Sequence, residues 1–160
     1  MNKQQALDYL IKNNIQFQLY EHPAVFTCEE AEIHCKHVPG LAVKNLLLKS
    51  DKGQFFLVVL PAHKKLDMNQ IKKLLEVKKL RFASAEDLMR LMKLEPGSVT
   101  PIGLINDKNK EIELILDNNV KDAEMVNFHP NVNTASVSLS KKEFEKFLNS
   151  LDRKARIIEL

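Results

Sequence analysis

Two consecutive apolar stretches decide the fold: LAVKNLLLK at residues 41–49 and QFFLVVLP at residues 54–61. Both are short and almost continuously apolar, which is typical of strands in the middle of a sheet. The four residues between them, SDKG, supply the Asp and Gly of a tight turn, so the two stretches are predicted to form a β-hairpin. A central hairpin indicates a sheet in which antiparallel pairing is common.

The first strand of this hairpin carries an ammonium group where an apolar side chain is expected. Because side chains alternate between the two faces of a strand, Lys44 shares a face with Leu46, and Asn45 points to the other face. Burying an ammonium among leucines is costly unless it is paired or points into a cavity filled by water or a ligand. Two interpretations of Lys44 stay open: a structural lysine that extends to the sheet edge or pairs with a carboxylate such as Glu21 or Glu30, or a cation in a binding site.

Helical and strand patterns surround the hairpin. Helices are predicted from apolar periodicity and capping-box residues at 3–13, 27–34, 68–76, 85–93 and 141–150. Strands are predicted at 15–22, 80–84, 102–106, 111–117 and 134–140, while residues 152–160 either extend the last helix or pack elsewhere. Because hairpins dominate the strand connections, we expect an α+β fold with a mixed, largely antiparallel sheet flanked by helices, built from residues 1–160 as a single domain.

Charge and composition exclude several classes of protein. With 24 Lys and Arg residues against 21 Asp and Glu residues, the net charge of +3 is too small for a protein that coats nucleic acid nonspecifically. The N-terminus lacks the apolar core of a secretory signal and no segment has the roughly 18 apolar residues of a membrane span, so a cytoplasmic protein without a membrane partner is expected. Cys28 and Cys35 lie near His34 and His37 but lack a second pair at zinc spacing, so we expect free thiols and no metal.

Two loops carry groups suited to a binding site. GSVTPIG, residues 97–103, places two glycines around a Thr-Pro pair, which lets a ligand approach a rigid main chain, although such residues also mark ordinary turns. NFHPNVNTAS, residues 127–136, places His129 in a polar loop. There the histidine can serve as a general acid or base, donate to a ligand, or play only a structural role. From spacing alone, both loops remain open to a structural explanation.

A third segment, EHPAVFT at residues 21–27, places His22 and Thr27 on either side of a Pro turn, and Thr27 is also explained as a helix cap. The sequence contains no Walker loop, no dinucleotide fingerprint and no marked Ser-His-Asp set or carboxylate pair. Most familiar enzyme classes are therefore unsupported.

Together and in this order, these motifs resemble the aminoacyl-tRNA deacylases related to the editing domain of prolyl-tRNA synthetase, the ProX and YbaK-like group. The resemblance covers nearly the whole chain, is most specific in GSVTPIGLIND and NFHPNVNTASVSLS, and is strongest to the free-standing enzymes that remove alanine from tRNA(Pro). It implies a YbaK-like fold and trans-editing hydrolysis of the ester in Ala-tRNA(Pro), with no cofactor. A Cys-tRNA(Pro) deacylase and a non-catalytic tRNA-binding module are the alternatives. The implied partners are the acceptor end of tRNA(Pro) and prolyl-tRNA synthetase.

The resemblance also assigns roles to residues. Lys44 matches the family's essential lysine and is expected to be catalytic, while Gly97 and Pro101 match a Gly-x-x-x-Pro loop whose main-chain N–H groups would stabilise an oxyanion. The substrate-binding residues expected are Asn45, Gly97, Ser98, Thr100, Pro101, Gly103, His129, Thr27 and His22, and the tRNA-binding residues expected are Lys49 and Lys79. Ile102 stands where the family often has an aromatic residue, and we expect this difference to alter the size of the pocket.

Overall fold

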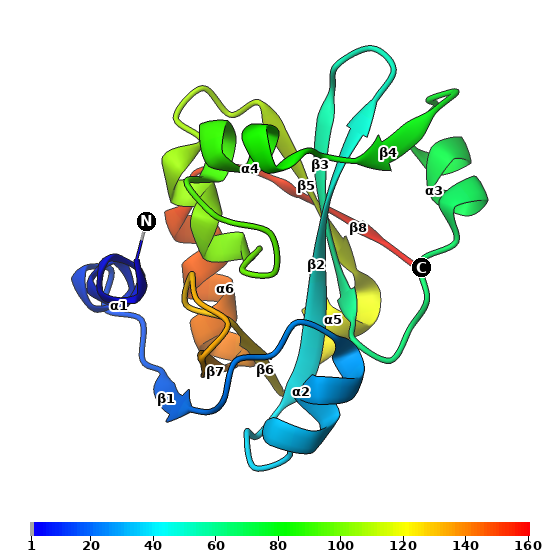
Figure 1. Cartoon of the computed structure of the whole chain (residues 1–160). Helices are drawn as coiled ribbons and strands as arrows, with labels where there is room; N and C mark the ends of the chain where they lie inside the picture. Colours follow the sequence, from blue (N-terminus) through cyan, green and yellow to red (C-terminus); the bar gives the residue numbers. More distant parts are fainter. Residues whose placement is uncertain (1) are drawn as a thin grey trace.

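The computed structural model describes residues 2–160 (Figure 1). The helices are α1 (Lys3–Lys12), α2 (Cys28–His34), α3 (Met68–Leu74), α4 (Ala85–Met92), the 3₁₀ helix η1 (Pro101–Asn106), α5 (Asn118–Asp122) and α6 (Lys141–Ser150). The strands are β1 (Gln18–Glu21), β2 (Leu41–Ser50), β3 (Phe55–Pro61), β4 (Leu80–Phe82), β5 (Ile112–Asp117), β6 (Met125–Phe128), β7 (Ala135–Ser140) and β8 (Ala155–Ile158). None of the helices in residues 2–160 is long and apolar enough to cross a membrane.

The strands form one mixed sheet in the order β1-β7-β6-β2-β3-β5-β8, with β4 paired to β2 beside this path. The predicted hairpin is present as the antiparallel pair β2 and β3. Antiparallel pairing also joins β1 to β7, β2 to β4 and β6 to β7, whereas β2 with β6, β3 with β5 and β5 with β8 are parallel. The predicted α+β class, with a mixed sheet flanked by helices, is confirmed.

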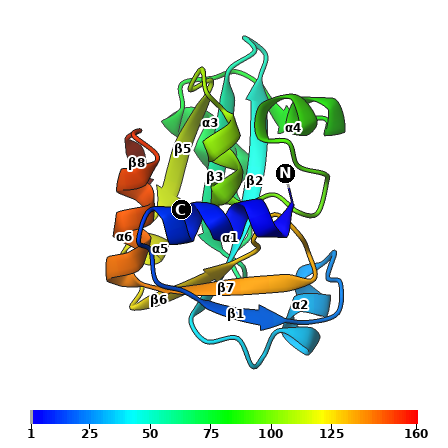
Figure 2. The same cartoon turned by 90° about the vertical axis from the view of Figure 1, so that its left-hand side faces the viewer.

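The long strand β2 joins two parts of the sheet. In Figure 2, β1, β7 and β6 run across the lower ends of the upright strands β2, β3 and β5. On the edge of β2 opposite β3, Leu41 and Ala42 pair with β6, and residues 48–50 pair with β4. Between these two contacts, residues 43–47 have no strand on that edge within the described range. This open stretch of β2 edge is where the candidate site lies.

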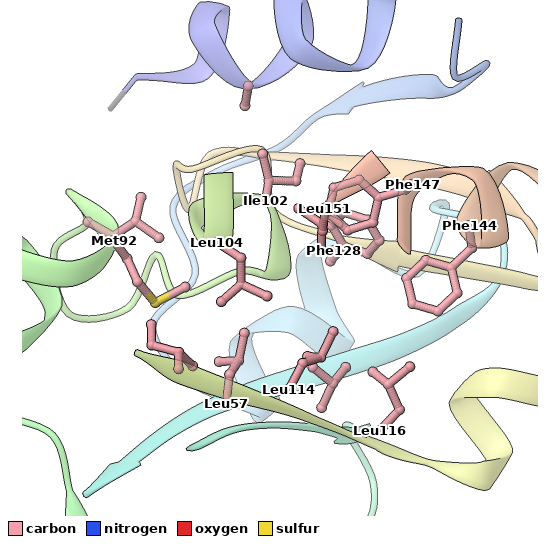
Figure 3. Close-up of a cluster of buried hydrophobic side chains, with 14 of the residues drawn as sticks. Leu57, Met92, Ile102, Leu104, Leu114, Leu116, Phe128, Phe144, Phe147 and Leu151 are labelled. Atoms are coloured by element: carbon pink, nitrogen blue, oxygen red, sulfur yellow. The ribbon is translucent and has the colours of Figure 1, made fainter. Parts of the chain in front are cut away.

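Two apolar clusters pack on opposite faces of β3, whose residues are all buried. Leu57 belongs to the larger cluster, with side chains from α1, α4, η1 and α6, and Val58 belongs to the smaller cluster on the α3 side. Figure 3 shows the larger cluster, in which Leu57 lies opposite Ile102 and Leu104 of η1, with the ring of Phe128 close by. Burial of each large apolar side chain contributes about 1.5–3 kcal/mol, so the core fixes the strands that carry the site.

Residues 102–106, predicted as a strand, instead form most of η1. Pro101 occupies the first turn, where its missing N–H and fixed φ favour a helical start. The hydroxyl of Thr100 accepts a hydrogen bond from the N–H of Ile102 at 3.4 Å, and the N–H of Gly103 donates to the carbonyl of Thr100 at 3.1 Å. These local bonds replace a strand ladder, so the strand prediction was wrong.

Three elements were not predicted. Strand β6 includes Asn127 and Phe128, which the sequence placed in a loop, and α5 follows the capping residue Asp117. The C-terminal residues form β8, which pairs with β5 and so resolves the alternative left open for the tail. These are short segments, and two of them, β6 and β8, pair with strands far away in the sequence, β2 and β5.

Candidate active site

A cavity of about 700 Å³ lies against residues 41–46 of β2. Its wall also includes α2, part of the 97–101 loop and the facing parts of β6 and β7. The cavity brings together five of the residues predicted to bind substrate or to be catalytic, namely Thr27, Lys44, Asn45, Gly97 and His129. They come from four separate segments, so the fold assembles this group.

Lys44 is half-buried in the cavity wall and its ammonium has no hydrogen bond or ion pair within the part of the chain that the structure describes. Both proposed carboxylate partners are engaged elsewhere. Glu21 pairs with Lys3 at 2.7 Å, and Glu30 accepts main-chain N–H groups at the start of α2. The ion-pair interpretation is therefore wrong, and Lys44 presents an uncompensated cation to the cavity.

Asn45 connects β2 to the 97–101 loop. Its Nδ2 donates a hydrogen bond to the carbonyl of Val99 at 3.2 Å. Its Oδ1 is buried without a partner in the described residues, a situation that costs about 1–3 kcal/mol for a polar group. Asn45 therefore tethers the 97–101 loop to β2 beside the cavity.

The 97–101 loop presents two free donors. Gly97 has φ +87°, a left-handed conformation that favours glycine, and it lines the cavity together with Val99. The N–H of Ser98 is used, since it donates to the carbonyl of Glu95 at 3.1 Å. The main-chain N–H groups of Gly97 and Val99 have no acceptor among residues 2–160, so both remain available to a ligand.

Three other predicted residues of the loop do not line the cavity: Ser98, Thr100 and Pro101. Thr100 is fully buried and caps η1, and Pro101 is buried in its first turn. Thr100 and Pro101 therefore fix the end of the loop at the start of η1, and this helps to position the main-chain N–H groups of Gly97 and Val99.

Gly103 and Ile102 are also absent from the cavity wall. A Cβ at Gly103 would lie 2.6 Å from the side chain of Leu94 and 2.9 Å from that of Met92, so glycine is required by packing. Ile102 is completely buried in the larger apolar cluster. The expectation that Ile102 sets the size of the pocket is therefore wrong.

His129 faces the cavity as a neutral ring. Its Nδ1 lies 2.9 Å from the carbonyl of Ala135, which only accepts, so Nδ1 carries the proton and Nε2 is left as an acceptor. Burial is the main cause that lowers the pKa of His129 below its ordinary value. The ring therefore offers a lone pair at neutral pH.

His22 lies behind the cavity wall. Its Nδ1 donates to the carbonyl of Pro23 at 2.9 Å, which leaves Nε2 to accept from the hydroxyl of Ser136 at 2.9 Å. The rings of His22 and His129 are 5.9 Å apart, and Ser136 lines the cavity. His22 thus orients the hydroxyl of Ser136. The sequence analysis did not single out Ser136, although the alternating serines of TASVSLS indicate a polar face on this strand.

Two thiols and an aromatic ring were also missed as wall residues: Cys28, Cys35 and Phe26. Both cysteines are free, and burial raises the pKa of the Cys35 thiol, which keeps it protonated. No cluster of three or more metal-ligating side chains occurs in residues 2–160.

A second cavity of about 580 Å³, called here the basic groove, is lined by the cations Lys49, Lys72, Lys78, Lys79 and Arg81. Both predicted tRNA-binding lysines lie in it. Lys49 is five residues beyond Lys44 on β2, or roughly 17 Å away at the rise of a strand. The Lys49 ammonium pairs with Asp87 at 3.2 Å, whereas that of Lys79 has no partner in the described part of the chain.

Comparison with known proteins gives consistent similarities. The model of the aminoacyl-tRNA editing domain matches residues 22–147. The prolyl-tRNA editing protein ProX of Acetoanaerobium sticklandii is 37% identical over 160 residues, which cover 99% of this chain and 97% of that protein. Prolyl-tRNA synthetase associated domain-containing protein 1 of Xenopus laevis is 33% identical over 151 residues, 91% of this chain and 89% of that protein. The crystal structure of a candidate trans-editing enzyme for prolyl tRNA synthetase shares the fold, with a TM-score of 0.76, 21% identity, and coverage of 100% of this chain and 97% of that one.

Proposed function

This chain belongs to the family of aminoacyl-tRNA editing domains, and we propose that it is a deacylase that hydrolyses the aminoacyl ester of mischarged tRNA(Pro) in trans, with Ala-tRNA(Pro) as its substrate. The observation that carries the proposal is Lys44, an unpaired cation in a cavity that also presents free main-chain donors. Editing of tRNA(Pro) is supported by the similarity to ProX over nearly the full length of both chains. The choice of alanine rests on the sequence motifs that resemble the alanine-removing enzymes.

In the proposed mechanism, the loop stabilises the oxyanion that forms when water attacks the ester carbonyl. The N–H groups of Gly97 and Val99 are the donors, since both line the cavity and neither has an acceptor within the described residues. Asn45 holds the loop against β2 through the carbonyl of Val99. Such preorganised donors require no rearrangement as charge develops.

Lys44 acts through its charge. A protonated lysine is a poor base, so we assign Lys44 to binding the ribose or terminal phosphate and to offsetting the developing negative charge. A ribose hydroxyl of the substrate helps to activate the attacking water. The neutral ring of His129, the hydroxyl of Ser136 and Thr27 also line the cavity, and we assign them to orienting the substrate.

Selection of alanine over proline follows from size. A site that admits a methyl group and excludes a five-membered ring spares correctly charged tRNA, but it discriminates weakly against side chains of similar or smaller size. We therefore expect glycyl and seryl esters to be side substrates. Cysteine is the main competitor, because its side chain is only slightly larger than that of alanine.

The basic groove is proposed to hold the phosphates of the tRNA acceptor stem. One of its five cations, Lys49, lies roughly 17 Å along β2 from Lys44, a distance that an RNA strand whose end enters the cavity can span. Lys79 is the better placed of the two predicted lysines, since Lys49 is already bonded to Asp87. We further propose that residues 1–160 act as one editing domain in the cytoplasm, alongside prolyl-tRNA synthetase.

The test is release of amino acid from tRNA(Pro) charged with alanine, cysteine or proline, measured for the native protein and for Lys44→Ala. We expect rapid release of alanine alone, and loss of release in the folded variant. Faster release of cysteine than of alanine would reassign the substrate. Binding of the tRNA without release of any amino acid would replace the deacylase by a tRNA-binding module.

A further inference from the structure

Phe26 is an exposed aromatic residue at the rim of the cavity. It lines the cavity wall, yet 71% of its surface is accessible. Leaving a phenyl ring in water forfeits about 1.5–3 kcal/mol of burial. What distinguishes Phe26 from the other exposed apolar residues is that it also lines the cavity, where its ring is free to contact a ligand.

The backbone of Phe26 is held in place although its ring is exposed. Its N–H donates to Oε2 of Glu30 at 2.6 Å, and the next residue, Thr27, caps α2 by accepting from the N–H of Glu30. The ring lies beside the loop that carries the proposed oxyanion donors, because a Cβ added to Gly97 would be 3.6 Å from the ring carbon Cδ1 of Phe26. The fold therefore holds the backbone of Phe26 in place, with its flat apolar ring next to the loop that carries the proposed oxyanion donors.

The cavity has room for more than an amino acid. Its volume of about 700 Å³ is within the range of roughly 300–1,000 Å³ that holds a drug-sized ligand, far more than an alanyl group occupies. In an aminoacyl-tRNA the ester joins the amino acid to the terminal ribose, so a base must lie next to any ester bound near Gly97. Single-stranded RNA ends are commonly bound by stacking of bases on aromatic side chains.

We propose that Phe26 is the platform on which the terminal base of the tRNA stacks. The ligand is the 3′-terminal nucleoside, and a purine suits the platform best because its two fused rings cover more of the phenyl face. This inference rests on the proposed function for the identity of the RNA. It assigns Phe26 to holding the substrate, with Gly97, Val99 and Lys44 left to act on the ester.

Ile33 provides a matched control. It lies on α2, the helix that begins just after Phe26, and is 70% exposed, but it does not line the cavity. If the exposed apolar residues in and just before α2 served only a general surface contact, changes at Ile33 and Phe26 would have similar effects. A stacking platform requires an effect at Phe26 alone.

The chain contains no tryptophan, so Phe26→Trp introduces a single fluorophore at the proposed platform. The probe is the uncharged trinucleotide CCA, titrated into Phe26→Trp and into Ile33→Trp. We expect saturable quenching of the tryptophan at position 26 and none at position 33. Equal quenching at both positions, or none at either, would overturn the proposal.

Kinetics give a second, independent readout. With an alanyl-tRNA substrate, Phe26→Ala is expected to raise KM roughly 5- to 150-fold with little change in kcat, the equivalent of ~1–3 kcal/mol for one stacked base. Phe26→Tyr should restore KM, because the flat ring is retained. A fall in kcat at unchanged KM would show that Phe26 shapes the ester site, and the stacking proposal would be wrong.

The two proposals fail separately. Deacylation by the native protein without quenching at position 26 would leave the proposed function intact and refute the platform. Quenching by CCA in a protein that releases no amino acid would refute the deacylase and support a terminal nucleoside site.

Discussion

Replacement of Lys44 by methionine separates the chemistry of the cavity from the stability of the fold. Methionine keeps an unbranched side chain of similar length and removes the ammonium. At about 4 Å and an effective dielectric constant of about 20, a cation stabilises a unit negative charge by ~4 kcal/mol. Because the charge that develops in the transition state is partial, we expect kcat/KM to fall by roughly 10²- to 10³-fold, which corresponds to ~3–4 kcal/mol.

The same substitution should leave stability unchanged or raise it. Lys44 has no ion pair or hydrogen bond within residues 2–160, so no favourable contact of its ammonium is lost on substitution. Placing a thioether beside Leu46 removes the cost of half-burying a charge. We expect the free energy of unfolding to rise by up to ~1 kcal/mol, equivalent to about 2–4 °C in Tm for a chain of this size.

The assay is single-turnover release of labelled alanine, with thermal unfolding followed by circular dichroism on the same preparations. Lys12→Met serves as the control, because Lys12 is an exposed cation at the end of α1, outside the cavity wall. Activity of Lys44→Met within about threefold of the native value would refute the electrostatic role. A fall in Tm beyond about 10 °C would show instead that the ammonium is a structural group.

Four further outcomes are expected. Gly103→Ala should lower the free energy of unfolding by ~1–3 kcal/mol in chemical denaturation, because its Cβ would lie 2.6 Å from a leucine methyl group. Arg153→Met should lower the free energy of unfolding by ~3–5 kcal/mol, because the buried Asp107 would lose its ion-pair partner at 2.9 Å. This loss should be smaller in the double variant that also carries Asp107→Asn. Burial lowers the pKa of His129 in the folded protein. The free energy of unfolding should therefore be constant above the ordinary histidine pKa of 6.5 and decrease below it, because the unfolded chain then binds a proton that the buried ring does not. His129→Asn should flatten this pH dependence, measured by urea titration. Lys79→Ala should raise KM for charged tRNA and reduce the slope of log KM against log salt by about one, whereas an unchanged slope would place the acceptor stem elsewhere.

The sequence predicted the elements that carry their own local signals. The β2–β3 hairpin follows from two apolar runs and an Asp-Gly turn, and capping boxes marked the starts of α2 and α4. Strand β8 carried no such signal, since its four residues, ARII, include a charge and show no clear alternation. These residues form a strand because they pair with β5. Residues 102–106 have the composition of a strand, but the hydrogen bonds to Thr100 and the fixed φ of Pro101 favour a 3₁₀ helix.

The sequence was less informative about which side chains of a motif face the ligand. In the 97–103 motif, Gly97 lines the cavity, while Thr100 and Gly103 face the core of the protein. A motif of this kind is recognised as a unit, and its spacing does not separate residues that contact a ligand from those that hold the loop. Phe26 was missed for a related reason, because an apolar residue beside a helix cap is expected to pack inward.

The gap in the pairing of β2 explains why two polar residues occur in a strand that is otherwise apolar. Lys44 and Asn45 point to opposite faces of β2, yet both line the same cavity. This is possible because β6 ends its pairing at Ala42 and β4 begins at Leu48, which leaves the strand edge between them uncovered. A strand paired along both edges would bury both groups against apolar layers, at a cost that neither an ammonium nor an amide could offset there. The open edge of the sheet therefore explains the polar pair in the sequence, because it lets a cation and a loop tether on opposite faces of one strand both line the same cavity.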